Sequence, residues 1–243
     1  MTIKGTLRDF AESHGYEIQR TTVYTSKKPR YQALFSLLHI DLVIDVGANT
    51  GQFATQCRTF GYHGEIISFE PSSSAHAALL QSAASDPRWT VADRMALGAA
   101  TGEAEINIAA NSVSSSILPM LNSHLSAAPN SAYLQKEKVP LRRLDDVLAP
   151  TFPGRSIFLK LDVQGYEPQV LAGAPQLLSQ TAAVQLEMSL LSLYDGEILM
   201  PQMTADMRAK GFRLWDLEPS FRDDNTGQLL QVDGIFTRQS PSA

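Results

Sequence analysis

Short apolar runs alternate with helix-like segments through the first hundred residues of the chain. The apolar runs are rich in β-branched and aromatic residues and stop at glycine, proline or charged residues, which predicts buried strands at 42–46, 65–70 and 89–93. Apolar residues recur at helical spacing between these runs, which predicts helices at 51–61 and 73–85. Strands that alternate with helices in this way form a parallel sheet.

The alternation returns in the second half of the chain. Two strands and two helices are predicted there, at 156–163, 182–188, 166–179 and 198–211. The last two predicted strands, 212–217 and 229–238, follow one another without a helix between them. Such a pair indicates an antiparallel end to an otherwise parallel sheet.

The middle of the chain has a different character. Residues 103–110 alternate in the manner of a strand, and 137–144 is a further candidate strand. Between them, 111–135 has no apolar period and is rich in serine, asparagine, alanine and proline, so we predict an irregular, lid-like insert. Residues 1–40 are predicted to form a helical segment ahead of a single domain that spans 41–243.

Composition and charge narrow the class of protein. The chain has 243 residues, of which 44% are apolar and 19% charged, which is typical of a globular domain with a hydrophobic core. The net charge of −5 and the dispersed basic residues disfavour nucleic acid as a partner. Cys57 is the one cysteine, so no internal disulfide is expected. No signal-peptide pattern and no run of about 20 apolar residues occurs, which leads us to expect a cytoplasmic protein without a transmembrane segment.

The sequence DLVIDVGANTGQFA, residues 41–54, places a glycine loop directly after the first predicted strand. In open α/β sheets, such a loop binds a nucleotide-like ligand. The dinucleotide fingerprint needs a glycine where this chain has Asn49, so a pyrophosphate is disfavoured. S-adenosylmethionine suits the loop better, because Asp45 can face its ammonium group. The backbone N–H groups near Gly47 and Gly51 can face its carboxylate.

Other residues are expected around the same ligand. Glu70 ends the second predicted strand, 19 residues after Gly51, where a carboxylate binds the ribose hydroxyls in such folds. Asp93 and Met95 follow the third strand, where the adenine ring is expected. The remaining residues expected to contact the cofactor are Asn49, Phe53, Pro71, Ser115 and Asp162.

Five motifs in order along the chain resemble the FkbM family of S-adenosylmethionine-dependent methyltransferases. They are IDVGANTGQF, SFEPSS, LKLDVQGYEPQVLAGA, VQLEMS and QVDGIFTR. The resemblance implies the α/β fold of class I methyltransferases, a Rossmann-like three-layer sandwich with a mostly parallel seven-stranded sheet and an antiparallel final strand. It also implies O-methylation, often of sugar hydroxyls on glycolipids, polysaccharides or macrolide-type products, and hence a place in glycolipid biosynthesis.

Two details of this resemblance concern single positions. The family's usual D-V-E-G is DVQG here, with Gln164 in place of the glutamate, which weakens any role assigned to that position. Ser115 and Ser116 resemble a serine position in the family's equivalent loop and are expected near the cofactor or the acceptor.

Methyl transfer to a hydroxyl needs a group that removes or compensates the hydroxyl proton. Asp162 and Glu187 end the fourth and fifth strands of the predicted sheet at its carboxyl edge, and Asp233 lies in the last strand. The three carboxylates predict either an Mg²⁺ site or a general base with two helpers, and Asp162 is the leading candidate for the base. His124, in the insert, is a further candidate because its ordinary pKa lies near neutrality.

The sequence predicts the acceptor only as a class of hydroxyl compound. The leading hypothesis is a small-molecule or glycolipid hydroxyl, most often on a sugar. Methylation of a non-sugar lipid or polyketide hydroxyl is the alternative, and a non-catalytic cofactor-binding module is a third reading. The carboxylates at several strand ends argue against that third reading. The oligomeric state stays open, a homodimer included.

Overall fold

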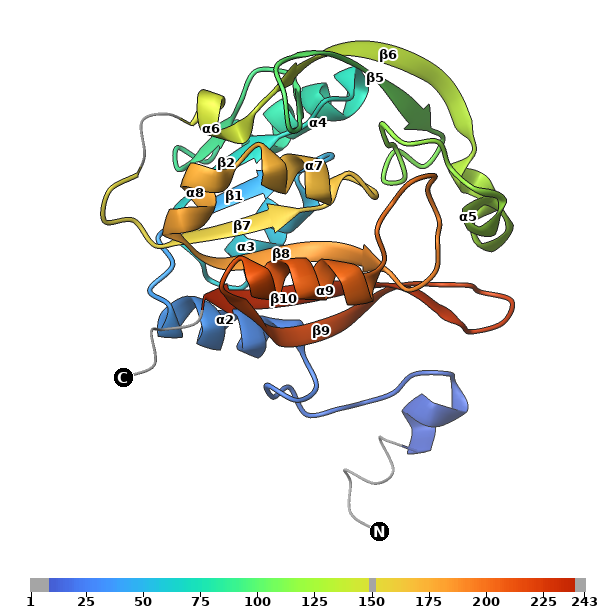
Figure 1. Ribbon diagram of the computed structural model, residues 1–243. Coiled ribbons are helices and arrows are strands. Elements are labelled where there is room, and N and C mark those ends of the chain that lie inside the picture. The colour runs from blue at the N-terminus through green and yellow to red at the C-terminus, as the bar shows by residue number, and fades with distance from the viewer. Residues whose placement is uncertain (1–8, 149–151, 239–243) are drawn as a thin grey trace.

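The computed structural model describes residues 9–148 and 152–238 (Figure 1). Its central sheet has seven strands in the order β3-β2-β1-β7-β8-β10-β9. The strands are β1 (Leu42–Val46), β2 (Glu65–Phe69), β3 (Trp89–Val91), β7 (Ile157–Leu161), β8 (Thr181–Ser189), β9 (Phe212–Arg222) and β10 (Leu229–Arg238). The strands β3, β2, β1, β7 and β8 run parallel to one another, whereas β10 runs antiparallel to both β8 and β9. The predicted fold class is confirmed.

Helices cover both faces of this sheet and complete three layers. One face carries α2 (Lys27–Leu37), α3 (Gln52–Thr59) and α4 (Ser73–Ala83), and the other carries α6 (Leu144–Val147), α7 (Glu167–Ala172), α8 (Pro175–Gln180) and α9 (Met200–Ala209). Successive side chains of β1 point to opposite faces of the sheet and so contribute to the hydrophobic cores on both faces. Val43 packs with Phe53 of α3, while Ile44 packs with Val170 of α7. Because both faces are covered, β1 and β7 are buried along their whole length.

A second, smaller sheet lies beside the carboxyl end of the main one. It consists of β4 (Ala96–Leu97), β6 (Tyr133–Arg142) and β5 (Gly102–Ala109), in that order. The predicted strands 103–110 and 137–144 are therefore present, but they pair with each other outside the main sheet. In Figure 1 they arch over the region of β2 and α4.

The segment 111–135, predicted to be irregular, contains ordered elements. They are α5 (Asn122–Ala127), a 3₁₀ turn (Pro129–Ser131) and the first residues of β6. Backbone hydrogen bonds from Leu121 to Leu193 and from Asp195 to Pro119 tie it to the loop after β8. Its few apolar residues pack with residues of that loop in one hydrophobic cluster. Because these residues follow no helix or strand period, the sequence pattern did not predict this packing.

The predicted N-terminal helical segment, 1–40, is only partly described. Residues 1–8 lie outside the described residues, 9–13 are helical, and α2 spans 27–37. Figure 1 shows residues 9–26 extending away from the body of the protein. No helix within the described ranges is long and apolar enough to cross a membrane.

The junction of β1 and β7 generates a stability prediction. Gly47 has a φ of +75°, and a Cβ atom placed there would lie 1.8 Å from the backbone oxygen of Asp162. Gly47→Ala should therefore lower the free energy of unfolding by roughly 2 kcal/mol or more, because strain and overlap add. Gly102→Ala is the matched control, since a Cβ there meets nothing within 4 Å. Urea denaturation of both variants tests this, and equal stability would contradict it.

Candidate active site

A cavity of about 340 Å³ opens where the carboxyl ends of β1, β2 and β7 meet the insert. Eight of the residues expected to bind the cofactor line it: Gly47, Asn49, Phe53, Glu70, Pro71, Met95, Ser115 and Asp162. Three others, Asp45, Gly51 and Asp93, are not among the lining residues. The volume and the mixed polar and apolar lining are typical of a small-molecule site.

The glycine loop after β1 turns through left-handed backbone conformations at Gly47, Asn49 and Gly51. The N–H groups of Gly47 and Ala48 both donate to the carbonyl of Phe69, at 3.0 Å each. These groups were expected to be free for a ligand carboxylate. They instead fasten the loop to the end of β2, because a buried N–H without a partner is costly.

Glu70 braces the same loop from the other side. Its Oε2 accepts a hydrogen bond from the N–H of Asn49 and its Oε1 accepts one from the N–H of Ser72, both at 2.8 Å. Burial raises the pKa of Glu70 to about 7, although the two N–H donors oppose the change. Each carboxylate oxygen keeps a second acceptor position. Glu70 can therefore hold the loop and still accept hydrogen bonds from ribose hydroxyls in the cavity.

Asp45 lies one layer below the cavity rather than at its surface. Its side chain is fully buried on the α2–α4 face of the sheet, and the nearest cation is Lys160 Nζ, 3.5 Å from Oδ1. Burial raises the pKa of Asp45, and the Lys160 ammonium opposes this. The expectation that Asp45 faces the ligand ammonium is not supported, because a cation of the protein itself takes that position.

The sequence-based search missed Lys160. Its Nζ lies 3.1 Å from Oδ2 of Asp162 and 5.4 Å from the centre of the Phe53 ring. The side chain lines the cavity floor. One signal was present in the sequence, a single charged residue inside the apolar strand IFLKL, and such residues are rarely buried without a partner.

Gln164 joins the two leading catalytic candidates. Its Nε2 donates to Oδ1 of Asp162 at 3.0 Å and to Oε2 of Glu187 at 2.5 Å. The hydroxyl of Tyr194 donates to its Oε1 at 2.5 Å. Gln164 has a φ of +55°, so the turn after β7 is held in an unfavourable conformation that points the amide between the two carboxylates.

The surroundings of Glu187 raise its pKa well above the usual range. Burial is the largest cause, followed by the charges of Asp162 and Asp233. Glu187 and Asp233 are direct partners in the β8–β10 ladder, and Gln231 Nε2 donates to Oε2 of Glu187 at 3.1 Å. A carboxylate with a raised pKa is suited to taking a proton near neutral pH.

The structure corrects the expectation of an Mg²⁺ site at Asp162, Glu187 and Asp233. The three residues lie around one cavity, yet the Lys160 ammonium and the Gln164 amide fill the spaces between the acidic groups. Among the described residues, no group of three or more histidine, cysteine, aspartate or glutamate side chains is arranged to hold a metal ion. Lys160 places a positive charge beside Asp162, and Gln164 donates hydrogen bonds to both Asp162 and Glu187.

Two further expected residues lie away from the cavity. His124 is buried in α5 against the rings of Tyr194 and Phe221, at centroid distances of 5.2 and 5.3 Å, and does not line the cavity. Burial lowers its pKa to about 4. Asp93 is exposed, whereas Met95 faces the cavity. The packing of the small sheet and of the insert determines whether these residues face the cavity, and the sequence pattern did not predict that packing.

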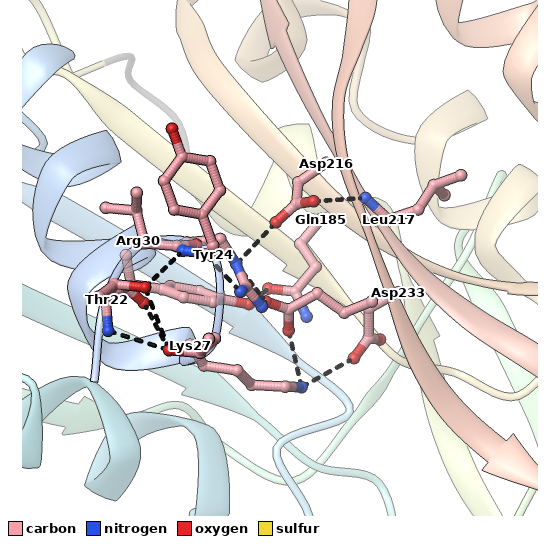
Figure 2. A network of polar contacts seen from close by, with 12 residues as sticks. Thr22, Tyr24, Lys27, Arg30, Gln185, Asp216, Leu217 and Asp233 are labelled. Atoms are coloured by element: carbon pink, nitrogen blue, oxygen red, sulfur yellow. Dashed lines mark hydrogen bonds and ion pairs between the residues drawn. The ribbon is translucent and has the colours of Figure 1, made fainter. Parts of the chain in front are cut away.

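The far end of the cavity is built by α2, β8, β9 and β10. Its lining residues are Lys27, Tyr31, Gln185, Glu187, Ser220 and Asp233. Tyr31 donates its hydroxyl proton to Gln185 at 2.8 Å, and Lys27 lies 2.8 Å from Glu218 and 3.7 Å from Asp233. Figure 2 shows Lys27 and Arg30 of α2 reaching towards the acidic residues of β9 and β10.

Comparison with known families identifies one domain. The family described as "Methyltransferase FkbM domain" matches residues 45–214, which span the glycine loop, Glu70, Asp162 and Glu187. Among curated proteins, no sequence matches the chain at a significant level.

The chain is similar to many solved structures at low sequence identity. A protein of Pyrococcus horikoshii assigned as an RNA methyltransferase is 12% identical, with all of both chains covered and a TM-score of 0.44. The glycopeptide N-methyltransferase MtfA, solved with sinefungin, is 11% identical, with 88% of this chain and 87% of that chain covered and a TM-score of 0.40. The ribosomal protein L11 methylase of Lactobacillus delbrueckii subsp. bulgaricus is 13% identical, with 87% and 80% covered and a TM-score of 0.42.

The buried acid Glu167 generates a pH prediction. Its Oε1 accepts a hydrogen bond from the N–H of Val163 at 2.9 Å, and burial raises its pKa from 4.5 to about 8. The folded state then binds the proton more tightly than the unfolded state. Its contribution to stability is complete below about pH 4.5 and is lost as the pH rises towards 8.

Glu167→Gln keeps the size of the side chain and an acceptor for Val163, but it removes this titration. Between about pH 5.5 and 7.5, the free energy of unfolding should fall less in this variant than in the wild type. The slopes of the free energy of unfolding against pH should differ by at most about 1.4 kcal/mol per pH unit. Urea denaturation across that range measures the slope, with exposed Glu103→Gln as the control. Identical slopes for wild type and Glu167→Gln would contradict the expectation.

Proposed function

The chain belongs to the FkbM methyltransferase family and is an S-adenosylmethionine-dependent methyltransferase, and on that premise we propose that it methylates a hydroxyl group. The acceptor that we propose is a sugar in a glycolipid or another glycosylated product. The observation that carries the proposal is the pair of carboxylates, Asp162 and Glu187, joined by the Gln164 amide at the cavity. Asp162 follows β7, next to the strand of the glycine loop, and Glu187 lies in β8 at the far end.

The residues at the glycine-loop end fit S-adenosylmethionine. Glu70 offers acceptors for the ribose hydroxyls, Met95 offers an apolar surface for the adenine ring, and Ser115 lies on the covering insert. The bound cofactor supplies a methyl group on a sulfonium, which is a good leaving group. The role of the insert 111–135 as a lid stays a prediction.

Glu187 is the residue that we assign to the proton. Among the described residues, both of its side-chain hydrogen bonds, from Gln164 and Gln231, fall on Oε2, which leaves Oε1 for an acceptor hydroxyl. Its raised pKa makes it a stronger base than an ordinary carboxylate. Both oxygens of Asp162 already accept, from Lys160 and Gln164, so Asp162 is better suited to orient the hydroxyl than to remove its proton.

The far end of the cavity suits a hydroxyl-rich acceptor. Gln185, Glu187 and Asp233 present hydrogen-bond acceptors there, and Ser220 adds a hydroxyl. Sugar hydroxyls are donors that match such groups. A non-sugar lipid or polyketide hydroxyl is the alternative, and screening lipid and oligosaccharide extracts for transfer of a labelled methyl group distinguishes them. A cytoplasmic location and the absence of a nucleic-acid partner stay predictions, and the oligomeric state stays open.

The role of Glu70 is tested by cofactor affinity. Glu70→Gln removes a charge-assisted acceptor for ribose hydroxyls and one acceptor for the loop N–H groups. It should weaken binding of S-adenosylhomocysteine by about 2 kcal/mol, or roughly 30-fold in Kd. Glu65→Gln, at the exposed opposite end of β2, is the matched control. Isothermal titration calorimetry measures both, and unchanged affinity for Glu70→Gln would place the ribose elsewhere.

Turnover of a Glu187 variant tests whether Glu187, rather than Asp162, removes the proton of the acceptor hydroxyl. Glu187→Gln should lower kcat by about 10²-fold or more, the usual scale for loss of a general base, while the Kd for S-adenosylhomocysteine changes little. It should also abolish the acid limb of the pH–rate profile. Exposed Glu105→Gln is the control. Normal turnover of Glu187→Gln would remove Glu187 from proton transfer and return that role to Asp162.

A further inference from the structure

Lys160 lies at the centre of the polar groups beneath the cavity. In the sheet register it stands beside Asp45 of β1 on one side and Gln185 of β8 on the other. The residue as a whole is only 7% exposed, and it lines the cavity. The strand therefore holds a lysine ammonium beside the Asp162 carboxylate at the wall of the cavity.

The ammonium has more than one carboxylate around it. Oδ2 of Asp162 lies at 3.1 Å and Oδ1 of Asp45 at 3.5 Å, and the charge of Asp233 also acts on it. The ring of Phe53 faces it at 5.4 Å. A buried ammonium that bridges two carboxylates has the position and charge of a bound cation.

We propose that Lys160 is the resident cation of the transfer site. In this role, which rests on the proposed function of Asp162, its ammonium fixes the Asp162 carboxylate towards the acceptor hydroxyl and takes the place of a divalent ion. Lys160 is then a positioning residue that acts through Asp162. The Gln164 amide holds the other oxygen of Asp162, so the carboxylate is fixed at both of its oxygens.

A purely structural role predicts something different. If Lys160 only neutralised the fully buried Asp45, removing both charges together would restore a normal site, since replacing both members of a buried pair is often tolerated. If Lys160 positions Asp162, the double change leaves Asp162 without its partner. The variants Lys160→Met and Asp45→Asn/Lys160→Met separate the two roles.

Both variants should keep their affinity for S-adenosylhomocysteine within a few fold, while kcat falls by about 10²-fold in each. Lys136→Met is the control, because Lys136 forms an exposed ion pair with Glu105, outside the cavity. Recovery of kcat in the double variant would overturn the proposal and leave Lys160 as the structural partner of Asp45. A lasting deficit in a folded double variant supports it.

A metal-binding measurement tests the same idea without any turnover. Lys160→Ser leaves Asp45 and Asp162 without their cation, so this variant should bind Mn²⁺, measured by loss of the free-ion signal in electron paramagnetic resonance. Wild type should not bind Mn²⁺ at the same concentrations, and adding Asp162→Asn should abolish binding by Lys160→Ser. Equal Mn²⁺ binding by wild type and Lys160→Ser, or none by either, would overturn the proposal.

The two measurements separate this inference from the proposed function. If no hydroxyl acceptor is methylated, the proposed function fails, while Mn²⁺ binding still decides whether Lys160 holds the cation position. If wild type is active but loses activity with a chelator and regains it with Mg²⁺, hydroxyl transfer stands and the resident cation is wrong. Activity of wild type that is indifferent to the chelator supports Lys160 in that role.

Discussion

Burial of charge beneath the cavity is the constraint on which the rest of the site depends. Asp45 and Lys160 are adjacent in the β1–β7 register, and both are buried in the layer between the sheet and α3. An isolated charge there would be very costly, so the two must occur together. The same ammonium extends the pair to Asp162 at the cavity floor. The position of a catalytic candidate is thus tied to the packing of the central strands.

A close approach of backbone to backbone reinforces this arrangement. The loop after β1 passes so near the end of β7 that a side chain at Gly47 would overlap the carbonyl of Asp162. The N–H of Asp162 donates to the carbonyl of Val46 at 3.0 Å, and Glu70 holds Asn49. The cofactor loop and the carboxylate after β7 are therefore parts of one rigid unit, which favours a fixed geometry for methyl transfer.

The end of the cavity formed by α2, β8, β9 and β10 is assembled from distant parts of the chain. Helix α2 reaches β9 and β10 through Lys27 and Arg30, whose partners include Asp216 of β9 and Asp233 of β10 (Figure 2). The insert is fastened to the loop after β8. Variation in these two segments can change the acceptor without disturbing the pairing of the central strands, because loops carry function while the sheet supplies the scaffold.

The sequence alone determined the alternation of strands and helices, the glycine loop after β1, the antiparallel final strand and the family. These features are encoded locally, by the periodicity of apolar residues and by the glycines and prolines that end strands and helices. The tertiary structure decided which polar groups meet. Lys160 lies between Asp45 and Asp162, and His124 packs against Tyr194 outside the cavity. The strands β5 and β6 pair in a second sheet. Those contacts join residues up to about 115 positions apart, and register and strand order, which no local pattern contains, bring them together.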